Sequence, residues 1–220
     1  MLRTVIVSSF LASMLLASGK QDAPKKLWLV KGPTPKVAVK DYMGSFAKLT
    51  DGLKKQFFKR IGGTAKTEKA QLEEARSYFA RSCKRIELRK GKTTIQKVDV
   101  HKDLAEDLVR ALNKALQSGY VPKKVEGIAV RGQRGKSTLL SEHALGRAVD
   151  LERTINVRRP RVNGKTIRRK AKSSEAAYKA LKKNPGSHFA IRWSTVKILL
   201  DAGFRWGGFF TKSDPMHFQK

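Results

Sequence analysis

Three kinds of residue are scarce in this chain, and each scarcity narrows what the protein can be. Among 220 residues there is one cysteine, Cys83, so no disulfide can form within the chain. There are only four histidines, and 18 acidic side chains stand against 48 basic ones. Beyond the N-terminus, no apolar run is long enough to cross a membrane. A disulfide-stabilised scaffold and a second membrane segment are therefore excluded.

The first nineteen residues follow the pattern of a secretory signal peptide. Arg3 gives a charged start, residues 4–16 are mostly apolar, and Ala17-Ser18-Gly19 offers small residues for cleavage. We therefore expect an exported protein, located in the periplasm or outside the cell at the cell wall. An uncleaved N-terminal anchor is the alternative, although the apolar run is short for a membrane span.

Basic residues dominate the charge. The formal net charge is +30, and without Arg3 the remaining 47 basic and 18 acidic residues leave +29. Such an excess is typical of proteins that bind polyanions, including nucleic acid. Because an exported protein meets the cell envelope first, we expect anionic envelope polymers as partners of this basic surface, and not nucleic acid. A charge that serves solubility alone is the alternative.

The hydrophobic pattern predicts an α+β fold. Hydrophobic residues make up 40% of the chain, which is enough for a packed core, and no internal repeat is present. Apolar periodicity, capping residues and stop residues predict helices over 67–86, 102–118, 173–183 and 194–202. Short strands are expected at 125–130, at 148–151 and in the C-terminal DPMHF segment. We expect a small, mainly antiparallel sheet that carries the functional site and is flanked by helices.

Three segments are harder to place. Residues 20–35 contain Pro24, Gly32 and two further prolines, which predicts an irregular leader, while residues 37–60 show a mixed pattern. Asn163-Gly164 favours a two-residue hairpin turn inside residues 156–170, a segment rich in basic side chains. The expected organisation is a signal peptide over 1–19, a partly helical region of unknown role over 20–95, and a main domain over 96–220.

Four further residues receive simpler interpretations. Cys83 follows the apolar stripe of the first helix, so we expect it in the core and not as a nucleophile. His101 begins the second helix and is expected to face solvent. His188 is assigned a structural role, and Trp206 a place in the core beneath the site.

Four residues could together form a catalytic metal site. Such a zinc site needs about three protein ligands, and His143, Asp150 and His217 could supply two imidazoles and one carboxylate. Asp214 could then accept a proton from a water activated by the metal, provided that Pro215 bends the chain between Asp214 and His217. A surface histidine and a structural aspartate at a strand end are the alternatives.

Two motifs strengthen the metal interpretation. SEHALGRAVDL resembles Ser-x-His-x-x-Gly-x-Ala-x-Asp of the zinc D-alanyl-D-alanine carboxypeptidases and L-alanyl-D-glutamate endolysin peptidases. GFRWGGFFTKSDPMHFQ resembles the second motif of that family, Gly-Phe-x-Trp-Gly-Gly followed by Asp-x-x-His-Phe. Arg131, ten residues before Ser141, matches an upstream arginine of the family. The resemblance covers roughly residues 95–220 and is silent on residues 20–95.

This resemblance implies a role for each matching residue. His143, Asp150 and His217 would bind one Zn²⁺, and Asp214 would be the general base. Arg131 would stabilise negative charge on the substrate carbonyl, and Ser141 would bind substrate or orient its loop. The implied substrate is the stem peptide of peptidoglycan.

Several functional alternatives remain open. A carboxypeptidase would remove a terminal D-alanine, whereas an endopeptidase would cut L-Ala-D-Glu or cross-link bonds in an open cleft. Phe209-Phe210 stands where several relatives have a longer polar segment, and could close one end of the pocket. A non-catalytic protein that binds the envelope or nucleic acid is the third possibility, although such a protein has no physical reason to keep all four site residues.

Overall fold

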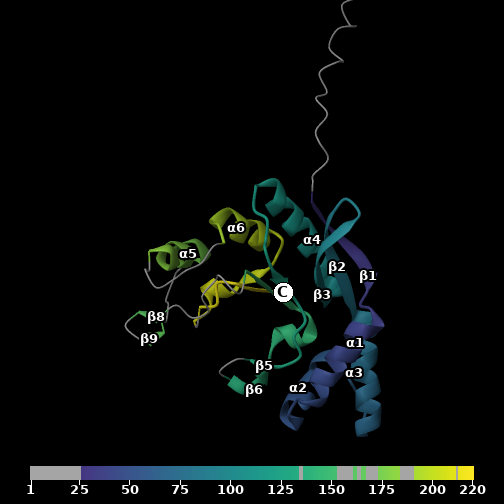
Figure 1. Cartoon of the computed structure of the whole chain (residues 1–220). Coiled ribbons are helices and arrows are strands. Elements are labelled where there is room, and N and C mark those ends of the chain that lie inside the picture. Colours follow the sequence, from purple (N-terminus) through teal and green to yellow (C-terminus); the bar gives the residue numbers. More distant parts are fainter. Residues whose placement is uncertain are drawn as a thin grey trace, which may run out of the picture.

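The computed structural model describes residues 26–133, 136–152, 161–162, 165–166, 173–183, 191–211 and 213–220 (Figure 1). The expected signal peptide, His188 and the turn at Asn163-Gly164 lie outside these residues. No helix in the described part of the chain is both long and apolar enough to cross a membrane.

Helices and short antiparallel sheets together give the α+β fold that the sequence predicts. The helices are α1 (Lys36–Ala47), α2 (Asp51–Ile61), α3 (Glu68–Ser82), α4 (Lys102–Gln117), α5 (Ser174–Lys182) and α6 (Trp193–Asp201). The predicted helices over 102–118, 173–183 and 194–202 are confirmed as α4, α5 and α6. Side-chain caps define several starts, as where the Ser173 hydroxyl accepts a hydrogen bond from the Ala176 amide at 3.2 Å.

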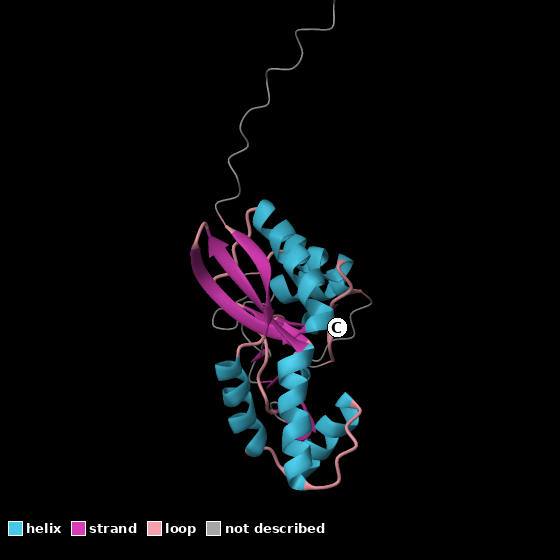
Figure 2. Ribbon diagram, turned by 90° about the vertical axis from the view of Figure 1, so that its right-hand side faces the viewer, coloured by secondary structure: helices cyan, strands magenta, loops and turns pink. Residues whose placement is uncertain are grey.

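A first sheet is formed by three long strands. These are β1 (Leu27–Pro33), β2 (Cys83–Lys90) and β3 (Thr93–His101), in the order β1-β2-β3 and antiparallel throughout. Figure 2 shows the three curved strands with helices along one face. Trp28, Ile86 and Val98 on that face share a core with α4. Residues 27–33 therefore form a strand, and the irregular leader predicted there is wrong.

The predicted helix over 67–86 ends earlier than expected. Helix α3 stops at Ser82, and Cys83 begins β2, so the apolar spacing continued across a helix–strand junction. Cys83 is buried, as predicted, and burial raises the pKa of its thiol to about 12, which keeps it protonated. His101 is also buried, so its predicted solvent exposure is wrong. Its Nδ1 accepts a hydrogen bond from the Asp103 amide at 3.3 Å, capping α4.

A second sheet carries the two sequence motifs. It has the order β10-β11-β7-β4, in which β10 is Arg205–Trp206, β11 is His217–Gln219, β7 is Ala148–Leu151 and β4 is Val125–Glu126. Strand β7 is confirmed as predicted, whereas the strand predicted over 125–130 is limited to β4. All pairings in the sheet are antiparallel.

Two small hairpins and two single-turn helices complete the described elements. Strands β5 (Gly132–Gln133) and β6 (Lys136–Leu140) form one hairpin. Strands β8 (Arg161–Val162) and β9 (Lys165–Thr166) form the hairpin predicted around Asn163-Gly164. The 3₁₀ helices are η1 (Glu142–Leu145) and η2 (Gly207–Phe209).

The first sheet and the second sheet share one hydrophobic core. Trp28 and Ile86 belong to the same buried cluster as Val149 and Phe218 of the second sheet. The expected boundary between residues 95 and 96 falls inside β3. A second cluster joins α1, α2 and α3 to Leu145 in η1.

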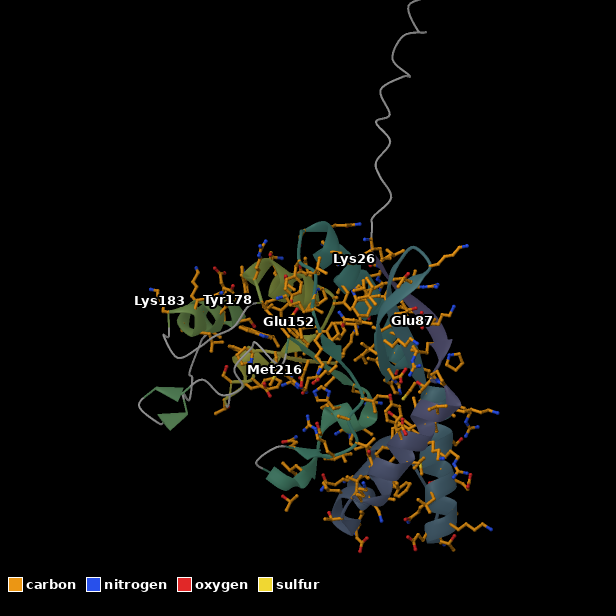
Figure 3. The ribbon with its side chains drawn as sticks, viewed as in Figure 1. Lys26, Glu87, Glu152, Tyr178, Lys183 and Met216 are labelled. Carbon is orange, nitrogen blue, oxygen red and sulfur yellow. The ribbon has the colours of Figure 1, made fainter. Side chains whose placement is uncertain are left out.

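Strand β7 ends in an unusual backbone conformation beside the final strand. Glu152 has a φ of 56°, a left-handed conformation that is uncommon for a residue other than glycine. Its side chain is buried and accepts a hydrogen bond from the Lys123 amide, while the Leu151 amide donates to the Met216 carbonyl at 2.9 Å. Figure 3 shows Glu152 and Met216 close together at the centre of the molecule.

Candidate metal centre

Strand pairing places two of the candidate ligands side by side. In the antiparallel register of β7 and β11, His217 lies directly opposite Asp150. Residues paired in this way present their side chains on one face with Cβ atoms about 4.5–5.5 Å apart. The preceding turn is closed by a hydrogen bond from the His217 amide to the Asp214 carbonyl at 3.0 Å. The bend expected between Asp214 and His217 is therefore present.

His143 arrives from the 3₁₀ helix η1. Gly146 ends this helix with a φ of 68°, and its amide donates to the His143 carbonyl at 3.1 Å. A Cβ on residue 146 would approach the His101 amide nitrogen to 2.7 Å, so the left-handed φ and the close approach both require glycine here. The tight turn returns the chain into β7 and so brings His143 back over Asp150.

The side chains of His143, Asp150 and His217 converge on one point. Asp150 Oδ1 lies 3.0 Å from His143 Nε2 and 3.1 Å from His217 Nδ1, and the two ring nitrogens are 3.2 Å apart. The ligand atoms of a tetrahedral zinc ion with bonds of about 2.0–2.1 Å lie roughly 3.3 Å apart. The spacing of these three atoms therefore fits a single metal ion.

The outer nitrogen of each imidazole already has a partner. His143 Nδ1 lies 2.7 Å from the Gly127 carbonyl oxygen, and His217 Nε2 lies 2.9 Å from Gln219 Oε1. Both partners are hydrogen-bond acceptors, so the ring N–H of each histidine is directed outward. In this tautomer the facing nitrogens would offer lone pairs to a cation between them and the carboxylate, as imidazoles that bind a metal do.

The ionisation of the cluster also favours positive charge at this point. Burial by itself raises the pKa of Asp150, but its hydrogen bonds to His143 and His217 outweigh burial and hold that pKa well below its usual range. Burial by itself lowers the pKa of His217, but the Asp150 carboxylate raises it, and the negative charge of Asp214 adds to the rise. The Asp214 carboxylate therefore acts electrostatically on the cluster.

Arg131 shares a pocket with two candidate ligands, and Ser141 directly precedes η1. The Ser141 amide donates to the Arg131 carbonyl at 3.1 Å, at the end of the β5–β6 hairpin. Arg131 lines a pocket of about 550 Å³ together with His143 and Asp150, which we call the metal-side pocket. Ser141 is buried. Arg131 thus lines the same pocket as two of the candidate ligands and is tied to Ser141 through the main chain.

Helices α2 and α3 hold the segment that carries His143. The Gln56 side chain donates to the Thr138 carbonyl at 2.6 Å and accepts from the Leu140 amide at 3.0 Å. Arg60 forms a bidentate ion pair with Glu142, with distances of 3.0 and 2.8 Å. The Tyr78 hydroxyl donates to the Leu145 carbonyl at 2.7 Å. The region before residue 96 therefore buttresses the segment 138–146 from outside.

The glycines of the second motif allow the final turn to pack closely. A Cβ on Gly207 would overlap the Asp214 carbonyl oxygen and reach His217 Cβ at 2.9 Å, and one on Gly208 would overlap the Trp206 ring. Trp206 is buried, as predicted, and its ring N–H donates to the Pro215 carbonyl at 2.8 Å. The motif thus fixes the turn that positions Asp214 and His217.

Comparison with known proteins bears on the same part of the chain. Residues 134–220 match the family model of the D-alanyl-D-alanine carboxypeptidases. The family resemblance is confirmed for this segment. Searches among curated proteins and among solved structures found no match to the chain.

The carboxypeptidase match covers less of the chain than the motifs suggest. It includes Ser141, His143, Asp150, Asp214 and His217 but begins three residues after Arg131. The resemblance expected over residues 95–133 is therefore not part of the match. Phe210 packs against His217, with ring centroids 5.9 Å apart, whereas Phe209 is 45% exposed.

Sequence reasoning missed the residues that orient the ligands. Gln219 could have been identified, because residues two apart on a strand share a face and Gln219 follows His217 by two. Gly127 binds His143 through its main-chain carbonyl, and the pattern of side chains in a sequence cannot predict such a contact. Gln56 and Arg60 lie more than 80 residues from their partners, so only the fold reveals their contacts.

The role of Gln219 can be tested through metal affinity. The Gln219→Leu variant loses the acceptor that keeps the His217 N–H directed outward, so we expect affinity for Zn²⁺ to fall about 10–100-fold. Competition with a chromophoric chelator measures this affinity. Gln117→Leu, an exposed glutamine at the end of α4, is the matched control and should bind Zn²⁺ as the wild type does. Equal affinities in the two variants would rule out the assigned role.

Proposed function

We propose that the chain is an exported zinc peptidase that hydrolyses a peptide bond in peptidoglycan stem peptides, as a D-alanyl-D-alanine carboxypeptidase. The observation that carries the proposal is the convergence of His143 Nε2, Asp150 Oδ1 and His217 Nδ1 within 3.0–3.2 Å of one another. The match of residues 134–220 to a carboxypeptidase family supports peptidase activity.

The three converging side chains would hold the zinc ion. With two neutral imidazoles and one carboxylate as ligands, one positive charge remains on the site. Zinc in such a site polarises a carbonyl oxygen and lowers the pKa of water to about 7. Gly127 and Gln219 would fix the orientation of the two imidazoles through their hydrogen bonds.

Asp214 would be the general base. Its backbone is held on both sides, by a bond from its amide to the Gly207 carbonyl at 2.8 Å and by the bond from the His217 amide to its own carbonyl. Its negative charge contributes to the raised pKa of His217, which supports a position near the site. From there Asp214 would take the proton of the attacking water and pass it to the leaving amine.

Arg131 and Ser141 would act on the substrate side. A guanidinium in the metal-side pocket would stabilise negative charge that develops on the substrate carbonyl oxygen. Ser141 would bind substrate or orient this segment, and its main-chain bond to Arg131 supports the second role.

Asp214 and His217 should differ in what their loss removes. His217→Ala deletes a ligand, so we expect it to release zinc and to lower thermal stability through the lost metal linkage. Asp214→Ala and Asp214→Asn should keep about one zinc per chain and the wild-type fold. They should lose activity by roughly 10²–10⁴-fold, as expected for a general base. Elemental analysis and mass spectrometry of digested muropeptides measure the two properties.

The muropeptide products also decide between the proposed reactions. Loss of one terminal D-alanine identifies a carboxypeptidase, whereas separated stem fragments identify an endopeptidase. An Asp214→Ala protein that is metal-free, or one that holds zinc and remains fully active, is incompatible with the assignment of Asp214 as base.

We further propose that the basic surface holds the enzyme on anionic cell-wall polymers. Replacing Arg158, Arg159, Arg168 and Arg169 by glutamine should weaken sedimentation with purified walls, and added salt should weaken it for the wild type. Exposed charges are screened beyond about 8 Å at physiological ionic strength. The matched control replaces four exposed lysines on or between α2 and α3: Lys55, Lys59, Lys66 and Lys69. If added salt and the arginine replacements both leave wall binding unchanged, the charge has another purpose.

A further inference from the structure

The metal-side pocket has a wall that lies outside the carboxypeptidase match. Within the matched segment, His143 and Asp150 line the pocket. Outside it, the pocket is lined by Tyr42 from α1, by Arg85 from β2, and by Lys97 and Asp99 from β3. A substrate group next to the reacting bond that entered this pocket would therefore touch side chains of the first sheet.

This wall is held rigidly by a buried network around Asp99. The Asp99 side chain is only 3% exposed and receives two hydrogen bonds from Arg85, from Nε at 2.9 Å and from Nη2 at 2.8 Å. The Tyr42 hydroxyl donates a third at 2.6 Å. Burial and the Asp99 carboxylate both raise the pKa of Tyr42, so this phenol remains a donor at neutral pH. All three side chains are therefore fixed before any ligand binds.

The same strand is connected to a metal ligand through the main chain. The Asp99 carbonyl accepts a hydrogen bond from the Ile128 amide at 3.0 Å. A Cβ on the adjacent Gly127 would overlap this carbonyl oxygen, so glycine is required there. The Gly127 carbonyl in turn accepts the bond from His143 Nδ1. The position of the wall relative to the candidate metal centre is therefore set by direct contacts.

Lys97 and Arg85 provide the hydrogen-bond donors of this wall. Lys97 is exposed and forms no hydrogen bond or ion pair with any residue in the described ranges. Arg85 uses Nε and Nη2 to bind Asp99, and Nη1 takes part in neither bond. A guanidinium has five N–H donors in a fixed plane, so Arg85 retains donors for a ligand. The Glu87 carboxylate, across β2–β3 from Lys97, accepts a hydrogen bond from Thr94.

The charge of the pocket favours an anionic ligand once a metal is bound. Acidic and basic side chains in its lining are equal in number: Asp41, Asp99, Glu126 and Asp150 against Arg85, Lys97, Lys124 and Arg131. Asp99 is paired with Arg85, and Glu126 with Lys124 at 2.6 Å. A divalent cation at the metal centre makes the sum positive, and Asp41 on α1 has no ion-pair partner among the residues that the structure describes. The balance therefore favours a carboxylate over an ammonium group.

We propose that the metal-side pocket is a substrate subsite that binds a carboxylate-bearing residue of the peptide, with Lys97 and Arg85 as its donors. This proposal rests on the proposed peptidase function and gives the region before residue 96 a part in substrate choice. Charge-assisted hydrogen bonds of this kind, at a partly exposed site, change binding by about tenfold.

Two matched peptides test the subsite. Acetyl-Glu-D-Ala-D-Ala and acetyl-Gln-D-Ala-D-Ala differ only by one carboxylate next to the terminal dipeptide. We expect the wild type to prefer the glutamate peptide about tenfold in kcat/KM, because Lys97 and Arg85 bind its carboxylate. Lys97→Met should reduce this ratio severalfold, because only Arg85 is left to bind the carboxylate. Lys90→Met, an exposed lysine at the end of β2 that does not line the pocket, should keep the wild-type ratio.

The ratio within one variant is independent of how much of that variant is active. A wild type that cuts both peptides equally well overturns the subsite and leaves the peptidase function intact. So does a Lys97→Met variant that keeps the tenfold preference. Calorimetric binding of the two peptides to zinc-loaded Asp214→Ala protein supplies the ratio without catalysis. If neither peptide is cut, the proposed function fails, and the binding ratio still decides for or against the subsite.

Discussion

The pairing of β7 with β11 is the constraint on which the candidate metal centre depends. Because side chains alternate along a strand, the register that sets His217 opposite Asp150 also sets Phe218 opposite Val149 in the core. A slip of one residue would turn His217 away from Asp150 and expose Phe218 at the same time. Burial of one apolar pair therefore enforces the alignment of one ligand pair.

The remaining contacts bring the third ligand to this pair and hold it. The Gly127 carbonyl orients His143, and Gly127 itself is packed against the Asp99 carbonyl of β3. On the opposite side, Arg60 and Tyr78 bind the segment that carries His143. The first sheet and the helices α2 and α3 thus support a centre whose ligands all come from the C-terminal segment. This explains why a domain boundary is difficult to place near residue 95.

Much of the site could be predicted from the sequence because its residues lie in two local motifs. The spacing in SEHALGRAVD predicts a turn at Gly146 between His143 and Asp150, and Pro215 predicts the bend before His217. Helix α5 could be predicted equally well from the sequence, since Ser173 caps it and Asn184-Pro185-Gly186 follows it. In each of these cases the decisive interaction is local in the sequence.

The first sheet could not be predicted in the same way. Cys83 and Ile86 continue the helical spacing of α3, although they lie on β2, where Ile86 packs on the α4 side and Cys83 packs with α1–α3. Because the two residues are buried on opposite faces of one strand, their spacing in the sequence looks like the apolar stripe of a single helix. The predicted solvent exposure of His101 is wrong because it, too, depends on packing between segments far apart in the sequence. A histidine at a helix start is polar in sequence, but here its ring lies under Tyr78, with centroids 5.8 Å apart.

X-ray absorption spectroscopy at the zinc edge is the most direct test of the central claim, that His143, Asp150 and His217 hold one metal ion. The purified protein, loaded with one equivalent of Zn²⁺ and dialysed, should retain about one zinc per chain. The spectrum should show nitrogen and oxygen ligands at roughly 2.0–2.2 Å, with the multiple-scattering pattern of two imidazoles. Zinc lost on dialysis, or a shell without imidazole, would contradict the account.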